Sequence, residues 1–165
     1  MVKETDEVDR IVQAWTAQRP DLDFSPLSVL SRVDRLSRHL DRARRDVFRR
    51  SDLEPWEWDV LSALRRAGEP FQLTPKQLLL QTLVSSGTMT NRIDRLVERA
   101  LVRREADPDD GRSILVILTD DGKTRVDAAI TRLVDAEAVL LDSLSRGDRD
   151  RLAALLRKLS LDFDA

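Results

Sequence analysis

Apolar residues recur at helical spacing in two stretches within the first 50 positions. The first predicts a short helix over residues 5–18, built on Val8, Ile11, Val12 and Trp15. Pro20 ends this helix, because proline disfavours helical backbone at the residue before it. The second helix is predicted to begin at Ser25 and Pro26, an N-cap followed by proline at the first helical position. Its apolar residues follow at every third or fourth position: Leu30, Val33, Leu36, Leu40, Ala43 and Val47. One apolar face over about six turns suits packing against a partner subunit.

The next 50 residues predict three shorter helices. The first covers 55–67 and ends at Gly68, which supplies the C-cap. The segment 74–77, TPKQ, has the capping-box pattern and opens a short helix to about residue 81. After a brief turn, a third helix begins at Ser85-Ser86 and runs to about residue 99.

The rest of the chain predicts a β-hairpin and two further helices. Residues 101–105 and 113–118 predict strands, separated by a turn over 107–111. Thr119 caps a long helix to about Leu144, and Asp148 opens a last one to about Leu161.

This order of elements predicts a fold that is mainly α with a small β-hairpin: a winged helix-turn-helix flanked by long helices. We expect residues 1–50 to hold an N-terminal helix and a long dimerisation helix. We expect residues 51–118 to form the winged helix-turn-helix DNA-binding lobe and residues 119–165 to form the C-terminal dimerisation helices, all within one continuous folding unit.

The helix from Ser86 divides into an apolar back and a polar front. On a helical wheel its back carries Met89, Ile93, Leu96 and Val97, which we expect to fill the core. Thr88, Asn91 and Arg95 lie roughly opposite, and Asn and Arg can pair bidentately with adenine and guanine. The free backbone N–H groups near Ser85 and Ser86 can meet a phosphate. The alternative is an ordinary amphipathic surface helix. The predicted DNA-binding residues are Thr74, Ser85, Ser86, Thr88, Thr90, Asn91, Arg95 and Arg112.

The turn between the two strands is acidic, which phosphate repels. Its one basic residue is Arg112, and Asp110 could hold that side chain through a charge-assisted hydrogen bond. Arg112 would then reach an adjacent minor groove, since narrow A·T tracts attract arginine. The alternative is a solvated turn with no role in DNA binding.

Charge is nearly balanced overall but is segregated along the chain. The 28 Lys+Arg and 30 Asp+Glu leave a formal net charge of −2. Residues 32–50 carry 8 Arg against 3 Asp, and residues 72–104 carry 6 basic against 2 acidic side chains. Two basic stretches can present one electropositive face to a polyanion, although arginine-rich helices can also simply be well solvated.

Composition also narrows the chemistry. The chain has no Cys and one His, His39, so it cannot form a disulfide, a thiolate zinc site or a metal cluster built on several histidines. There is no nucleophile–base constellation and no Gly-rich loop, so we expect neither an enzyme nor a cofactor. No apolar run is long enough to span a membrane, and the polar start lacks a signal-peptide core. We therefore expect a cytoplasmic protein.

Four motifs together resemble the MarR family of bacterial transcriptional regulators. They are LTPKQL, SSGTMTNRIDRLVERALVRR, DPDDGRS and ILTDDG, in the family's order and spacing. The resemblance implies a homodimer, joined through N- and C-terminal helices, on a pseudo-palindromic double-stranded DNA operator. It also implies a small anionic or aromatic effector that releases the DNA. Gly111 departs from the family pattern, because many members carry a basic residue there.

A second resemblance is to the urate-responsive PecS/HucR-like branch of this family. It rests on Trp15, four residues before Arg19-Pro20-Asp21-Leu22-Asp23, on the extra N-terminal helix. The branch's effector site then falls, motif by motif, on four residues: Trp15, Asp59, Arg92 and Arg104. The implied effector is urate or a tricarboxylic acid such as citrate or trans-aconitate.

The residues themselves allow two interpretations of this site. Arg92 lies at the edge of its helix's apolar face, so it can turn inward. Asp59 is flanked by apolar residues, and a buried carboxylate needs a partner, which Arg92 or Arg104 could supply. An anionic planar ligand could then stack on Trp15 and bind Arg92. Alternatively, Trp15 is a core anchor and Asp59–Arg92 a structural ion pair. The leading hypothesis for the whole chain is a ligand-responsive dimeric repressor; the alternative is a winged-helix DNA-binding or assembly module without an effector.

Overall fold

The computed structural model describes residues 5–82, 84–108, 110, 113–161 and 163. It divides into two compact units, Met1–Ala43 and Arg44–Ala165. The division falls inside the long second helix, α2 (Ser25–Arg50). Val47 and Phe48, near the end of α2, are buried in the core of the second unit, which explains why that unit begins before residue 50.

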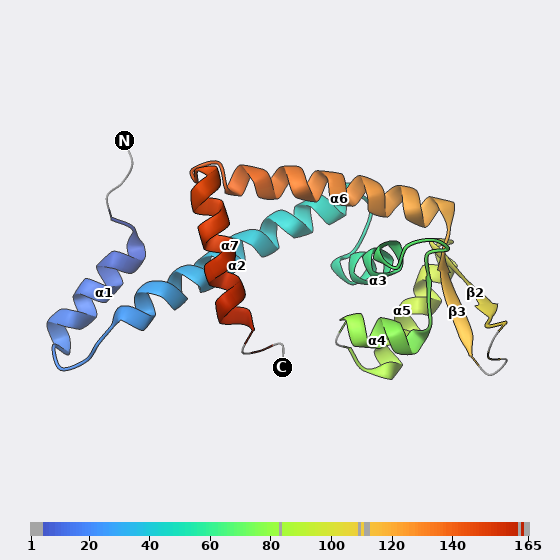
Figure 1. The fold of residues 1–165 in the computed structure, drawn as a ribbon, viewed down its shortest axis with the longest axis horizontal. Helices are drawn as coiled ribbons and strands as arrows, with labels where there is room; N and C mark the ends of the chain where they lie inside the picture. The colour runs from blue at the N-terminus through green and yellow to red at the C-terminus, as the bar shows by residue number, and fades with distance from the viewer. Residues whose placement is uncertain (1–4, 83, 109, 111–112, 162, 164–165) are drawn as a thin grey trace. The chain divides into compact units, whose positions relative to one another are not determined.

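The first unit is a helical hairpin of α1 (Glu7–Gln18) and the first part of α2 (Figure 1). Asp6 caps α1 by accepting a hydrogen bond from the backbone N–H of Asp9, and Asp9 accepts one from Asp6 in return. Arg32 of α2 bonds both carboxylates, at 2.9 Å to Asp6 and 2.6 Å to Asp9. Val8 is buried beneath these ion pairs. The charged residues of α1 therefore fix it against α2.

The described part of the second unit contains eight further elements. They are α3 (Pro55–Arg66), β1 (Gln72–Leu73), α4 (Pro75–Thr82), α5 (Ser86–Glu98), β2 (Val102–Ala106), β3 (Ile114–Leu118), α6 (Asp120–Leu140) and α7 (Arg146–Ser160). The strands form an antiparallel sheet in the order β1-β3-β2, with β2 and β3 as a hairpin beside α5 (Figure 1). This arrangement confirms the predicted winged helix-turn-helix.

The strand β1 was not predicted. It pairs Gln72 with Ile117 and Leu73 with Val116, and so adds a third strand to the hairpin. A strand of two residues has no alternation of polar and apolar positions, so the sequence carries no periodic signal for it.

The core of the second unit is formed by α3, α4, α5 and the sheet, together with the end of α2 and part of α6. Met89, Ile93 and Leu96 of α5 are almost completely buried, as predicted. Val97 is 37% exposed, so its assignment to the core face was wrong. Val97 follows Met89 by eight residues. At the helical period this separation places Val97 about 80° around the helix from Met89, at the margin of the apolar face.

Most helix starts follow the predicted capping chemistry. Gln77 accepts from the backbone N–H of Thr74 at 2.8 Å, and Thr74 accepts from that of Gln77 at 3.3 Å. Two predicted boundaries need correction. Ser25 is the first residue of α2, with Asp23 accepting its N–H, and Ser145 rather than Asp148 caps the last helix. Asp148 is the residue that donates its backbone N–H to that cap, at 3.2 Å.

Gly122, at the start of α6, provides a test of the packing between α6 and the sheet. A Cβ there would lie 2.1 Å from the Leu101 carbonyl oxygen and 2.9 Å from a Leu118 methyl carbon. Gly122→Ala should therefore lower the free energy of unfolding by about 1–3 kcal/mol, measured by chemical denaturation. Gly87→Ala is the matched control, because nothing lies within 4 Å of its added Cβ. Equal stability of the two variants would contradict this packing.

Candidate nucleic-acid interface

The start of α5 carries a cluster of exposed hydroxyl groups. Ser85 caps the helix by accepting from the backbone N–H of Thr88 at 3.4 Å, and the two hydroxyl oxygens lie 2.9 Å apart. The Thr90 hydroxyl donates to the carbonyl of Ser86 at 3.2 Å. All four residues are exposed. This end of α5 therefore offers hydroxyl groups beside a helix N-terminus, a site that favours negative charge.

Asn91 and Arg95 follow on the same side of α5, and both are exposed. Neither side chain makes a hydrogen bond or ion pair with another residue that the structure describes. The Arg95 guanidinium lies over the indole ring of Trp56 in α3, with its carbon 4.7 Å from the ring centroid. The polar front of α5 thus keeps its hydrogen-bonding groups available, while the apolar back is buried.

The two other predicted DNA-contacting residues lie outside α5. Thr74 is partly buried, and its hydroxyl and backbone N–H are both engaged with Gln77 at the start of α4. Arg112 and its neighbour Gly111 lie outside the described residues, so the contact predicted between Arg112 and Asp110 stays a prediction.

Two predicted effector residues, Asp59 of α3 and Arg92 of α5, lie close enough for the charge of Arg92 to act on the Asp59 carboxyl. The Asp59 side chain is exposed at the surface of α3, so the predicted burial of this carboxylate is wrong. Desolvation by the neighbouring protein atoms still raises the pKa of the Asp59 carboxyl above its ordinary value, while the positive charges of Arg92 and Arg66 act in the opposite direction. Arg92 is half-buried, and its Nη1 is shielded from solvent without a hydrogen-bond partner among the described residues. Its guanidinium carbon lies 5.9 Å from the centroid of the Trp56 ring. A buried donor without a partner is uncommon and costly, which makes this position a candidate binding site.

Arg104 is placed differently from the expectation. Its Nη2 forms an ion pair of 2.5 Å with Asp94 of α5, so it links β2 to α5 instead of serving as the partner of Asp59. The positive charge near Asp59 comes from Arg92 and Arg66. Asp94 follows Ile93 on α5, and only the folded hairpin shows that it faces β2.

Trp15 belongs to the first unit. It is 52% exposed and stacks on Phe24, with ring centroids 6.2 Å apart and an angle of 26° between the planes. Trp15 is therefore not buried within the first unit. One face of the stacked pair can receive a planar ligand.

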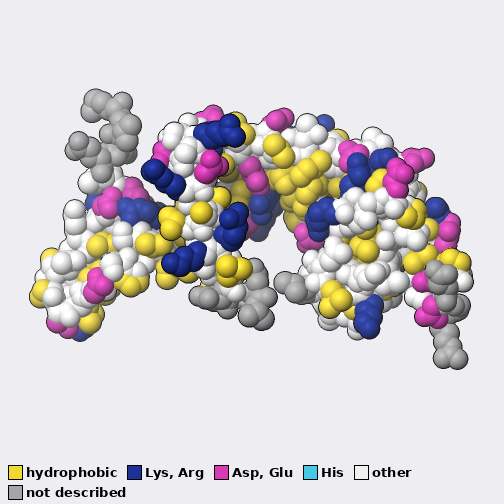
Figure 2. Space-filling model, in the orientation of Figure 1, with side chains coloured by type: hydrophobic (Ala, Val, Ile, Leu, Met, Phe, Trp, Pro, Cys, Tyr) yellow, Lys and Arg dark blue, Asp and Glu magenta, His cyan; other side chains and the backbone are white. Residues whose placement is uncertain are grey.

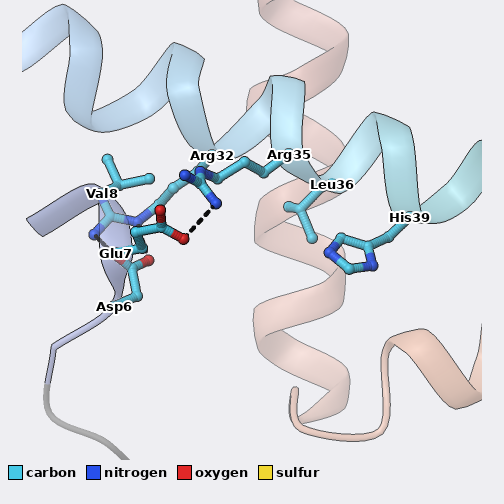
Figure 3. Close-up of a pocket in the computed structure, with 7 residues that line it drawn as sticks. All are labelled: Asp6, Glu7, Val8, Arg32, Arg35, Leu36 and His39. Atoms are coloured by element: carbon cyan, nitrogen blue, oxygen red, sulfur yellow. Dashed lines mark hydrogen bonds and ion pairs between the residues drawn. The ribbon is translucent and has the colours of Figure 1, made fainter. Parts of the chain in front are cut away.

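A cavity of about 340 Å³ lies between α1 and α2 in the first unit (Figure 3). Arginines line it, but Arg35 is paired with Glu7 at 2.8 Å and Arg32 with Asp6 and Asp9. Leu36 and His39 lie further along α2 (Figure 3). Because the carboxylates of α1 already neutralise these cations, the cavity is a weak candidate for an anion.

Sequence reasoning missed an ionic network that holds the end of α5. Arg99 donates to the buried carboxylate of Glu57 at 2.5 Å and to Asp52 at 2.8 Å. Glu57 also accepts the backbone N–H of Glu54 at 2.8 Å, which caps α3. The spacing of Glu54 and Glu57 before an apolar run was the available signal, because it has the form of a capping box.

Comparison with known proteins supports the interpretation of α5 as part of a DNA-binding interface. The chain is 35% identical over 153 residues to the transcriptional regulator PecS of Dickeya dadantii, covering 93% of this chain and 92% of PecS. It is 30% identical over 153 residues to the transcriptional repressor NicR of Pseudomonas putida, covering 90% of this chain and 94% of NicR. The chain belongs to the MarR family. The family's own sequence model matches residues 51–113, which include the elements from α3 to β2.

Solved structures of MarR proteins share the fold. A variant of Escherichia coli MarR in complex with operator DNA matches with a TM-score of 0.68 at 25% identity, over 94% of this chain and 99% of that one. BpsR of Bordetella bronchiseptica, whose DNA binding is regulated by 6-hydroxynicotinic acid, matches with a TM-score of 0.68 at 27% identity, over 84% of this chain and 96% of BpsR.

The chain is thus a MarR-family, DNA-binding transcriptional regulator of the PecS-like branch, and the expectation of a regulator rather than an enzyme is confirmed. Among the helices that the structure describes, none combines the length and the apolar character that a membrane-spanning segment needs.

The raised pKa of Asp59 predicts how stability depends on pH. Because the folded protein disfavours the ionised carboxylate, the ionisation of Asp59 costs stability as pH rises through its folded and unfolded pKa values. Asp59→Asn removes this cost, so its melting temperature should equal or exceed that of the wild type at pH 7. The difference should disappear as the pH approaches 4.

Asp52→Asn is the control with the opposite sign. Hydrogen bonding to Arg125 and the charge of Arg99 lower the pKa of Asp52, so its ionised form stabilises the folded protein. This variant should melt below the wild type at pH 7, and its deficit should shrink as pH falls. A destabilised Asp59→Asn variant at pH 7 would show that Asp59 is mainly an ion-pair partner.

Proposed function

We propose that this MarR-family protein is a homodimeric repressor that binds a pseudo-palindromic operator and is released by a small anionic or aromatic effector. The observation that carries the DNA-binding assignment is the division of α5. Met89, Ile93 and Leu96 are buried, while Asn91 and Arg95 are exposed without hydrogen-bond partners among the described residues. A helix that enters the major groove needs this division. The similarity to a MarR–operator complex supports the same assignment.

Exposed apolar residues support dimerisation. In the first unit, Val29, Leu30, Val33 and Leu36 of α2 are between 39% and 64% exposed. In the second unit, hydrophobic side chains lie at the surface along α6 and α7 (Figure 2), among them Val134, Val139, Leu155 and Leu159. Helices that expose an apolar face of this kind bury it in an interface. A second copy of the chain is the partner that fits a repressor of a pseudo-palindromic operator.

Arg95 is the residue to test for DNA reading. Arg95→Ala should weaken binding to the selected operator by about 1–3 kcal/mol while leaving the melting temperature unchanged. Fluorescence anisotropy at fixed salt concentration measures the affinity. Arg49→Ala is a control with the same change of charge, at an exposed position of α2. If Arg95→Ala retains full affinity for the operator, the proposed reading face is wrong.

We further propose that the effector binds at Arg92, on the side of the second unit that also carries Asp59; Arg104 and Trp15 are the other effector-binding residues that the family resemblance implies. The Nη1 of Arg92 has no hydrogen-bond partner among the described residues, and the pKa of Asp59 is raised; both support a site that accepts an anion or a protonated group. Regulation of BpsR by 6-hydroxynicotinic acid supports a small, planar effector class. Urate and tricarboxylic acids are the compounds to screen first.

Thermal shift with urate, citrate, trans-aconitate and salicylate tests the effector site. At least one compound should raise the melting temperature of the wild type, because a ligand that prefers the folded state stabilises it. Arg92→Gln should abolish this rise and retain operator binding. Arg66→Gln is the control, since Arg66 also acts on Asp59 but is exposed. A full rise in Arg92→Gln would contradict the site, and no response in the wild type would favour the effector-free module.

A further inference from the structure

Trp56 lies between the two proposed functions of α5. It is the second residue of α3, directly after Pro55, and its partly buried ring packs against the core of the second unit. The ring contacts two guanidinium groups of α5: that of Arg95 at 4.7 Å and that of Arg92 at 5.9 Å, measured from the guanidinium carbon to the ring centroid.

For Arg95 the ring is the contact that sets its orientation. Arg95 makes no hydrogen bond or ion pair with any residue in the described part of the chain, so its long side chain would otherwise sample many rotamers. A cation over the face of an indole is attracted by the ring's quadrupole, and tryptophan is the strongest of the aromatic side chains in this respect. A side chain held before binding loses less conformational entropy when it meets its partner.

The ring itself is fixed by the fold. Pro55 and the Glu54–Glu57 capping pair define the first turn of α3, and the buried Glu57 carboxylate is bonded to Arg99 at the end of α5. The same helix pair thus carries both the ring and the guanidinium, and their relative position follows from a buried ionic contact.

We propose that Trp56 is a positioning residue for DNA reading, because its indole face holds the Arg95 guanidinium in the orientation that meets the operator. This inference rests on the proposed function, in which Arg95 reads the DNA.

A double-mutant cycle of Trp56→Leu and Arg95→Ala tests the inference. Operator affinity is measured by fluorescence anisotropy, on a duplex selected by the protein from random sequences. Trp56→Leu alone should weaken binding by about two- to fivefold. The double variant should bind no more weakly than Arg95→Ala alone, since the ring has nothing left to position.

Base discrimination provides a measurement that a merely structural role would not change. On operators with single base-pair replacements, Trp56→Leu should relax discrimination at the same base pair as Arg95→Ala and at no other. Trp56→Phe keeps an aromatic face and should restore most of the affinity and discrimination.

Trp58→Leu is the matched control. Trp58 lies two residues further along α3 and stacks on Phe48 at 5.1 Å, and the structure records no cation over its ring among the described residues. The Trp58→Leu variant should lower the melting temperature, and its effect on operator affinity should be independent of that of Arg95→Ala. Circular dichroism confirms folding of each variant at the assay temperature, and Trp56→Met replaces Trp56→Leu if the latter does not fold.

The outcomes separate the inference from the function on which it depends. Arg95→Ala could weaken operator binding while the loss of affinity in the double variant equals the product of the two single losses. That result overturns the positioning role and leaves the proposed reading face standing. If Arg95→Ala leaves affinity and discrimination unchanged, the reading face is wrong and the positioning role falls with it. If Trp58→Leu couples to Arg95 as strongly as Trp56→Leu does, the effect is general loosening of α3, which also overturns the inference.

Discussion

The contact between Arg99 and the buried carboxylate of Glu57 fixes the end of α5 to the start of α3. Glu57 is 1% exposed, so its charge is tolerable only because Arg99 and the backbone N–H of Glu54 satisfy it. This contact sets how α5 is oriented on the core. Met89, Ile93 and Leu96 then face inward, and the opposite side of the helix is left for polar residues. Both proposed activities depend on that orientation.

DNA reading and effector binding are proposed to use adjacent surfaces of the same helix pair. Arg92 and Arg95 are one turn apart on α5, and both guanidinium groups contact the ring of Trp56. Asp59 lies one turn after Trp56 on α3 and responds to the charge of Arg92. An anion at Arg92 would therefore act on the same packed contacts that orient Arg95. The ring of Trp56 alone can couple the proposed effector site at Arg92 to the proposed DNA-reading residue Arg95, provided that α3 and α5 shift together.

The distribution of charge explains why a nearly neutral chain can still bind DNA. Most arginines of the basic stretch 32–50 are paired with acidic side chains. They are Arg32, Arg35, Arg38, Arg44 and Arg49. That stretch is therefore less electropositive than its composition indicates. Arg95 differs from these arginines, because its guanidinium rests on an aromatic ring and no described carboxylate neutralises it. An unpaired cation on the polar side of a helix is more useful to a polyanion than several paired ones.

The sequence alone determined the fold class, the order of every element except β1, most helix starts and the two sides of α5. Each of these depends on local periodicity or on capping within a few residues, and such signals are written in the chain itself. The partners of Arg104, Arg99 and Arg95 were decided only by the tertiary structure. Asp94, Glu57 and Trp56 lie on other elements or faces, and an arginine among many carboxylates gives no sequence signal for its choice. Packing of α3, α5 and the hairpin against one core selects those partners, because only the folded chain brings them within contact distance.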